Sequence, residues 1–352
     1  MRERAWHRTT IGRLALVAAL AVLVAATAGS APAAAPPAEA AQVTRVRVGS
    51  LRVLSEAPMA LARARGYFAA EGLELELEEF AVTADAMPPL GTGQISVVSG
   101  GLNPAVFNAV ARGVDVKIVA SGGSLGPDND WLGLVVRRAH VDSGRYRGPA
   151  DLRGMRIAVP GPYTVVHYAL KVLLEQNGLT LADVDAVPVS MADHAQAVNN
   201  ASVDAAFTVE PFVAQAVSLG GAVRVLGVHE VVPFLAGGFM AYSPAFPAGN
   251  PDAAVRYMVA WLRGVADYNT AFGPERRGTD EAVQILRDAG IVVNPNTQLP
   301  LFQRDGHFDV EGMAGMLAWY VAEGVVPPGI DLARLVDFQY VDRAAERLGI
   351  TR

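Results

Sequence analysis

The chain has 352 residues, of which 51% are hydrophobic, and a formal net charge of −6 at pH 7. A net negative charge is not typical of a nucleic-acid-binding protein, which carries an excess of Lys and Arg. The length is sufficient for two domains. Because cysteine is absent, disulfides, a thiolate nucleophile, Cys-ligated zinc and a lipid-modified Cys anchor are excluded.

The first 40 residues have the pattern of a secretory signal peptide. Four arginines precede an apolar run from Leu14 to Ala26, and an Ala- and Pro-rich stretch then leads to Ala38-Glu39-Ala40. The apolar run is too short to span a bilayer comfortably, and the small residues offer a cleavage site before Ala41. We therefore expect an exported protein, periplasmic or otherwise extracytoplasmic, that is not a Cys-anchored lipoprotein. The alternative is an uncleaved membrane anchor with the Ala/Pro stretch as its tether.

From residue 43 onward, short apolar strands alternate with amphipathic helices, a pattern typical of parallel α/β units. In the first part we predict strands at 46–53, 73–80, 95–98 and 116–120, with helices at 58–65 and 104–112 and another ending near Leu90. The apolar stretch at 131–136 then leads into a polar segment at 137–147. We expect the chain to cross into a second domain within this polar segment.

A second α/β unit is predicted next. It has strands at 156–159, 186–189, 205–209 and 223–228, and helices at 164–177, 192–199 and 211–219. The return crossing is expected between His229 and Gly238, and helical periodicity follows at 251–271, 279–289 and 310–323. We expect these last helices to pack on the first domain.

Four segments of the chain resemble one family of exported binding proteins. They are 64–73, with the sequence ARGYFAAEGL; 90–96, LGTGQIS; 151–159, DLRGMRIAV; and 203–212, VDAAFTVEPF. In this order and spacing they are similar to the SsuA/THI5-like family, also called NMT1/THI5-like, which serves nitrate, sulfonate, taurine and thiamine-precursor transporters. Val209 stands where this family usually places an aromatic residue before the Glu-Pro pair.

The resemblance implies an α/β fold, the type II periplasmic binding protein, with two lobes joined by a doubly crossed hinge. Residues 43–136 and 239–352 would form lobe one, and residues 137–238 would form lobe two. It also implies a monomer that captures a small polar or zwitterionic molecule containing nitrogen or sulfur, with no metal or cofactor. Its partners would be the permease and ATPase of an ABC importer, and no nucleic acid.

Two other functions remain open. A sensor ectodomain with the same two-lobed fold would report its ligand to a membrane partner instead of delivering it. An enzyme similar to the fungal thiamine-pyrimidine synthase is a further alternative, but that enzyme depends on a Cys-rich motif that this chain lacks. The sequence also has no His-x-x-x-His pair, G-x-S-x-G motif or P-loop, so we expect no catalytic residue.

Candidate ligand-binding residues follow the predicted strands, because ligands of open α/β sheets bind beyond the carboxyl ends of strands, near helix N-termini. Glycine there permits close backbone approach, and hydroxyl, amide or imidazole groups supply hydrogen bonds. The candidates are Ser55, Gly100, Gly101, Asn103, Ser124, Tyr163, Thr164 and His167. The alternative for each is a turn, helix-cap or packing role.

Glu210 is a further candidate, since it ends a predicted strand immediately before Pro211. A carboxylate facing the ligand would accept hydrogen bonds from an amine, amidine or aminopyrimidine. The alternative is that Glu210 stabilises the N-terminus of the following helix.

Overall fold

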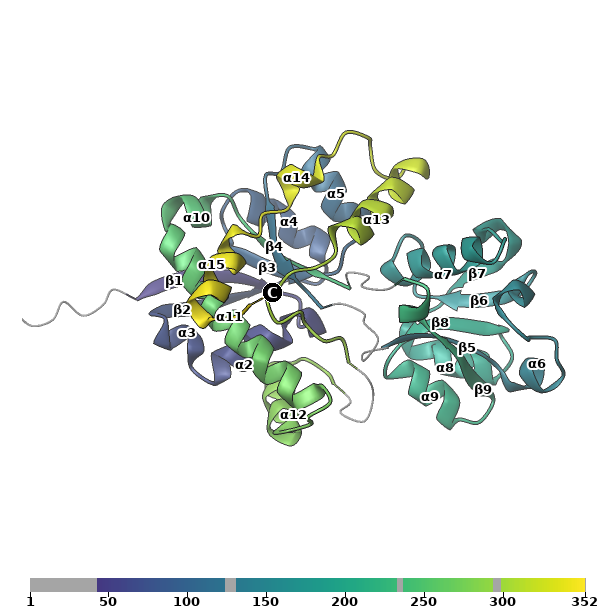
Figure 1. The fold of residues 1–352 in the computed structure, drawn as a ribbon. Helices are drawn as coiled ribbons and strands as arrows, with labels where there is room; N and C mark the ends of the chain where they lie inside the picture. Colours follow the sequence, from purple (N-terminus) through teal and green to yellow (C-terminus); the bar gives the residue numbers. More distant parts are fainter. Residues whose placement is uncertain (1–42, 124–130, 233–236, 294–298, 352) are drawn as a thin grey trace, which may run out of the picture. The chain divides into compact units, whose positions relative to one another are not determined.

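The computed structural model describes residues 43–123, 131–232, 237–293 and 299–351 (Figure 1). The predicted signal segment, 1–40, and Ser124 lie outside these residues. Within them, the strands form two five-stranded sheets with helices on both faces, which is the α/β fold that the resemblance implied. No helix in these ranges combines the length and hydrophobicity needed to cross a membrane.

The first sheet has the strand order β2-β1-β3-β10-β4. Its strands are β1 (Thr44–Ser50), β2 (Leu73–Glu79), β3 (Val97–Gly100), β4 (Lys117–Ser121) and β10 (Phe239–Tyr242). β1 runs parallel to β2 and β3, whereas β10 is antiparallel to both β3 and β4. β2 is an edge strand in which leucines alternate with glutamates, so its charged side chains remain in water while Leu73 is buried.

The second sheet has the order β7-β6-β8-β5-β9. Its strands are β5 (Leu132–Arg137), β6 (Arg156–Val159), β7 (Asp185–Pro188), β8 (Ala205–Val209) and β9 (Ala222–Gly227). β6 is parallel to β7 and β8, but β5 lies antiparallel between β8 and β9. The expectation that residues 131–136 belong to lobe one is therefore wrong, because β5 pairs with β8 and β9 of the second sheet. A fully apolar strand buried on both faces looks the same in either sheet, and its pairing alone decides where it belongs.

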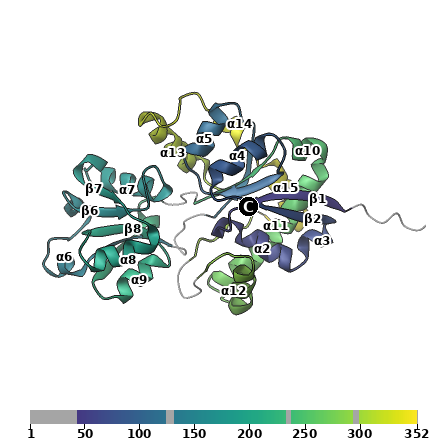
Figure 2. The ribbon, with the colours of Figure 1, turned by 180° about the vertical axis from the view of Figure 1, so that it is seen from behind.

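Helices cover both faces of each sheet. Around the first sheet these are α2 (Ala57–Ala64), α3 (Tyr67–Ala70), α4 (Thr83–Gly91), α5 (Pro104–Ala111), α10 (Ala245–Gly249), α11 (Pro251–Phe272), α12 (Thr279–Asp288), α13 (Val310–Ala322), α14 (Leu332–Leu335) and α15 (Gln339–Leu348). Around the second they are α6 (Arg138–Asp142), α7 (Val165–Gln176), α8 (Met191–Asn199) and α9 (Phe212–Ser218). Both views show α4 and α5 on the opposite face of the first sheet from α2 and α11, and α7 opposite α8 and α9 (Figure 2).

The chain passes from the first sheet to the second after β4 and returns before β10. The two crossing segments are hydrogen-bonded to each other: Gly122 N–H donates to Gly238 O at 2.9 Å, and Gly237 N–H donates to Gly123 O at 2.9 Å. A Cβ on Gly122 would lie 2.5 Å from the backbone of Gly238. The two segments can approach this closely because both carry glycine. The doubly crossed connection predicted from the resemblance is confirmed.

Candidate functional site

Ser55 lies in a short 3-10 helix, η1 (Leu54–Glu56), beyond the carboxyl end of β1. Its hydroxyl oxygen is buried and has no hydrogen-bond partner among the described residues. The neighbouring Glu56 carboxyl group is 2% exposed and accepts hydrogen bonds from Ser50 Oγ at 2.7 Å and from Leu51 N–H at 2.6 Å. Burial raises the pKa of Glu56, and these hydrogen bonds oppose the rise. Glu56 thus holds the turn that places Ser55.

Gly100 ends β3 at the same edge of the sheet, and η1 contacts this strand. A Cβ on Gly100 would lie 2.6 Å from the hydroxyl oxygen of Thr83, a buried residue at the start of α4. The adjacent Gly101 is exposed, with open space where its Cβ would be. Sequence reasoning missed Thr83 and Glu56. A hydroxyl or carboxyl residue at a helix start beyond a predicted strand would have been the signal for both.

Asn103 is the N-cap of α5. Its Oδ1 accepts a hydrogen bond from Ala105 N–H at 2.9 Å, and its Nδ2 donates to Gly101 O at 3.1 Å. Both ends of this amide therefore serve the local turn, which favours the helix-cap role for Asn103.

The second group of candidates follows β6 and is held together by local hydrogen bonds. Thr164 is the N-cap of α7: its Oγ1 accepts from His167 N–H at 3.2 Å and donates to Gly161 O at 3.1 Å. Tyr163 N–H donates to Nδ1 of His167 at 3.1 Å. The structure thus brings Tyr163, Thr164 and His167 together at the start of α7.

His167 is in the neutral form in this arrangement. Burial lowers the pKa of His167, although the Glu323 carboxylate opposes this shift. Because Nδ1 accepts a hydrogen bond from Tyr163, the neutral ring carries its proton on Nε2. The imidazole therefore presents one defined N–H donor at Nε2.

Aromatic side chains of α13 cover this group. The ring centroid of Trp319 lies 5.5 Å from that of Tyr163 and 5.4 Å from that of His167. Trp319 is 4% exposed, and its indole N–H has no hydrogen-bond partner among the described residues. The Tyr320 hydroxyl donates to Tyr163 O at 2.9 Å. Sequence reasoning missed both residues, because the apolar sequence of α13 indicates a packing helix and nothing more.

Tyr320 also connects this group to the first sheet. Its ring lies 5.9 Å from the ring of Phe107 in α5, the helix capped by Asn103. α13 thus contacts both the α5 side of the first sheet and the start of α7 beside the second.

Glu210 is already engaged within its own sheet. Its Oε2 accepts from Ala214 N–H at 3.0 Å, in α9, and its Oε1 lies 4.0 Å from Nη1 of Arg224. The side chain is 7% exposed. These contacts favour the role of stabilising the helix start over that of binding an amine, because Arg224 already balances the carboxylate charge.

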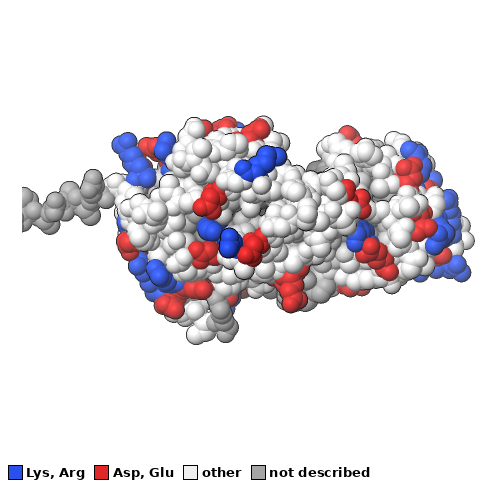
Figure 3. Space-filling model, turned by 90° about the horizontal axis from the view of Figure 1, so that it is seen from above, with Lys and Arg blue, Asp and Glu red and all other residues white. Residues whose placement is uncertain are grey.

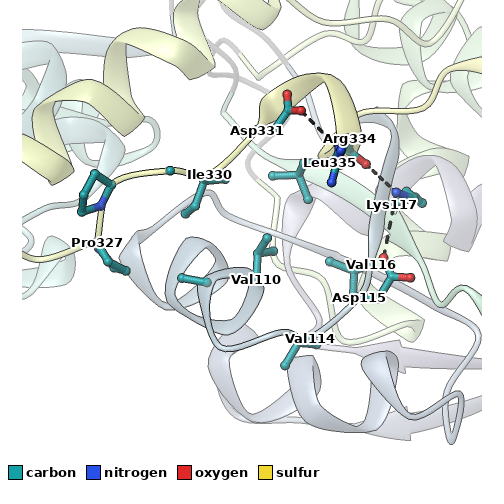
Figure 4. Close-up of a pocket in the computed structure, with 13 residues that line it drawn as sticks. Val110, Val114, Asp115, Val116, Lys117, Pro327, Ile330, Asp331, Arg334 and Leu335 are labelled. Atoms are coloured by element: carbon teal, nitrogen blue, oxygen red, sulfur yellow. Dashed lines mark hydrogen bonds and ion pairs between the residues drawn. The ribbon is translucent and has the colours of Figure 1, made fainter.

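A cavity of about 410 Å³ lies elsewhere, between the end of α5 and residues 327–335 (Figure 4). Lys117, at the start of β4, donates to Arg334 O at 2.5 Å and lies 3.9 Å from Asp115, while Arg334 Nε is 3.4 Å from Asp331. These charged groups of the cavity therefore pair with one another. None of the predicted site residues lines the cavity. Because β4 runs parallel to β3, this cavity is at the opposite end of the sheet from Gly100.

On the face seen in Figure 3, basic and acidic side chains are interspersed, and wide areas between them carry neither. The segments 99–103 and 161–167, which hold most of the candidates, contain no Lys or Arg. These two parts of the candidate site therefore consist of hydrogen-bonding groups and aromatic rings, and neither segment contains a basic side chain.

Two mixed α/β sheets joined by two crossings define the type II periplasmic-binding fold. Residues 39–272 match the NMT1-like family, and the chain belongs to this family. The resemblance recognised from the sequence is thereby confirmed.

Among proteins known individually, the chain is similar to the riboflavin-binding protein RibY of Chloroflexus aurantiacus, with 29% identity over 284 residues, 78% of this chain and 76% of that protein. Its fold is similar to that of the periplasmic aliphatic sulphonate binding protein SsuA of Escherichia coli, with a TM-score of 0.64 and 18% identity over 83% of this chain and 92% of that one. The fold is also similar to that of the desulfurization enzyme DSZB, with a TM-score of 0.60 and 13% identity. This match covers 87% of this chain and 99% of the DSZB chain. The fold therefore carries both binding proteins and an enzyme, and the ligand must be inferred from the site.

Proposed function

We propose that this chain is an extracytoplasmic solute-binding protein that delivers a small molecule to the permease and ATPase of an ABC importer. The observation that carries the proposal is the pair of glycine segments that cross between two α/β sheets of the NMT1-like family. Such a connection permits hinge closure around a ligand, which is the motion that a transport shuttle needs. The secretory pattern of residues 1–40 supports export, and a monomer suits this role.

For the ligand, we propose a planar nitrogen heterocycle of the flavin type. Tyr163 and His167 offer aromatic faces that Trp319 packs behind, and the Nε2–H of His167 offers a donor to a ring carbonyl. The similarity to a riboflavin-binding protein supports the same class. A cationic amine receives less support than it did from the sequence, because Glu210 already contacts Ala214 and Arg224.

A sulfonate is the second candidate ligand. The structural similarity to a sulphonate-binding protein favours it, and helix N-termini such as those of α5 and α7 suit an anion. The lack of basic residues in segments 99–103 and 161–167 argues against an anion held by a salt bridge there.

The experiment is calorimetric titration of the mature protein with riboflavin, taurine and a short alkanesulfonate, with chromatography of the ligand afterwards. We expect riboflavin to bind and to be recovered unchanged. At about 100 times its dissociation constant it should add about 2.7 kcal/mol to the free energy of unfolding. Sulfonate binding without riboflavin binding would overturn the flavin proposal, and conversion of the ligand would indicate an enzyme instead of a carrier.

A further inference from the structure

The backbone of Tyr163 has an unusual conformation that other residues hold in place. Its φ is +59°, in the left-handed region that a bulky residue rarely occupies. Such a conformation costs free energy and persists only when its surroundings enforce it. Here the N–H of Tyr163 donates to His167 Nδ1 at 3.1 Å, and its carbonyl oxygen accepts from the Tyr320 hydroxyl at 2.9 Å. Both polar groups of this residue's main chain are thus bound by side chains.

The two side chains that bind Tyr163 are themselves well anchored. Tyr320 is fully buried, with its ring 5.9 Å from Phe107 and 5.3 Å from Trp319. His167 lies within α7, where its own N–H is bound by the Thr164 cap, and its ring meets Trp319 edge to face at 82°. Neither side chain can turn away without disrupting these contacts.

We propose that His167 and Tyr320 are positioning residues that hold Tyr163 in its left-handed conformation and so orient the Tyr163 ring for the ligand. This inference rests on the proposed function. We call the arrangement of His167, Tyr320 and Tyr163 the Tyr163 clamp. Tyr320 comes from α13, which also contacts α5 beside the first sheet. The conformation of the Tyr163 loop, which follows a strand of the second sheet, therefore depends on a helix that also packs beside the first sheet.

The clamp affects affinity by setting the fraction of molecules that are ready to bind. Without the clamp, Tyr163 relaxes toward negative φ, and part of the binding free energy is then used to restore the binding conformation. The apparent dissociation constant then rises by the factor by which the competent fraction falls. Loss of one net hydrogen bond corresponds to a factor of about three to ten.

The test uses riboflavin as the probe and four variants of the full mature protein. Tyr320→Phe removes the hydroxyl and keeps the ring, while His167→Phe removes the acceptor and keeps a ring. His167→Asn retains an acceptor near the position of Nδ1. The control is Tyr268→Phe, in α11, because the Tyr268 hydroxyl is buried without a partner among the described residues. Amide hydrogen exchange over residues 160–168 of the ligand-free protein is measured alongside the dissociation constant.

We expect Tyr320→Phe and His167→Phe each to raise the dissociation constant about three- to tenfold and to accelerate exchange at 160–168. His167→Asn should restore slow exchange but only part of the affinity, because it keeps an acceptor for Tyr163 N–H and lacks the Nε2–H donor; Tyr268→Phe should change neither readout. Unchanged exchange in both clamp variants would overturn the proposal. Equally fast exchange in His167→Asn and His167→Phe would overturn the positioning role of His167. If the wild-type protein binds no riboflavin, the proposed ligand fails, and the exchange data alone decide for or against the clamp.

Discussion

The backbone N–H of Gly122 lies 2.9 Å from the carbonyl oxygen of Gly238, so that the two segments crossing between the sheets are directly hydrogen-bonded. These residues are 116 positions apart in the chain, and they meet because β4 and β10 are neighbours in the first sheet. Because these hydrogen bonds join the two segments, neither segment can move away from the other without breaking them. The closeness of the two backbones leaves no room for a side chain between them.

Replacement of Gly122 by alanine should therefore destabilise the protein. The new Cβ would lie 2.5 Å from Gly238 C and Phe239 N, both backbone atoms that cannot move independently. We expect a loss of about 1–3 kcal/mol in the free energy of unfolding, measured with urea. Gly148→Ala is the matched control, because its Cβ meets nothing within 4 Å, and it should stay within about 0.5 kcal/mol of the wild type. A neutral Gly122→Ala would show that the crossing segments can separate at little cost.

Ser55→Ala tests the first group of candidate residues. The Ser55 hydroxyl is buried without a hydrogen-bond partner among the described residues, so a bound ligand can supply one. We expect ligand affinity to fall by about 0.5–1.5 kcal/mol, with the stability of the ligand-free protein unchanged or slightly raised. Calorimetry and urea unfolding measure the two quantities separately. Unchanged affinity would remove Ser55 from the site.

Glu210→Ala distinguishes the two roles considered for this residue. Because its carboxylate accepts from Ala214 N–H and faces Arg224, we expect the variant to lose about 0.5–2 kcal/mol of stability while riboflavin affinity stays the same. Thermal unfolding and titration provide the two measurements. The opposite result, a tenfold weaker riboflavin affinity at full stability, would show that Glu210 contacts the ligand.

The pH dependence of stability should carry a contribution from His167. Burial lowers the pKa of His167 in the folded protein below its ordinary value of about 6.5, so the unfolded chain binds the proton more readily. This stabilising contribution is present above pH 6.5 and is lost as the pH falls through the folded pKa. Urea unfolding between pH 5 and pH 8 should therefore show stability rising with pH, and less steeply in His167→Phe. The remaining slope includes His194, whose pKa burial also lowers. Equal slopes in both proteins would contradict this assignment.

Local sequence signals predicted most of the elements closely. The α7 helix, predicted at 164–177, spans Val165–Gln176 with Thr164 as its N-cap and Asn177 as its C-cap, because hydrophobic periodicity and capping residues are read within a few positions. The positions of Thr164 and Asn103 after strands predict ligand contacts for both, and in the structure both residues cap helices. A cap residue and a ligand-binding residue share the same sequence signature, so the sequence could not separate these roles.

The sequence by itself determined the α/β alternation, the bounds of most helices and strands, and the family, since each follows from local patterns or from short segments in a fixed order. The tertiary structure alone decided that β5 joins the second sheet, that Arg224 faces Glu210, and that Tyr320 binds the backbone of Tyr163 from 157 residues away. These pairings join residues far apart in the chain, and no local pattern records them. They form because the fold brings a buried donor to a buried acceptor, and burial makes an unpaired polar group costly.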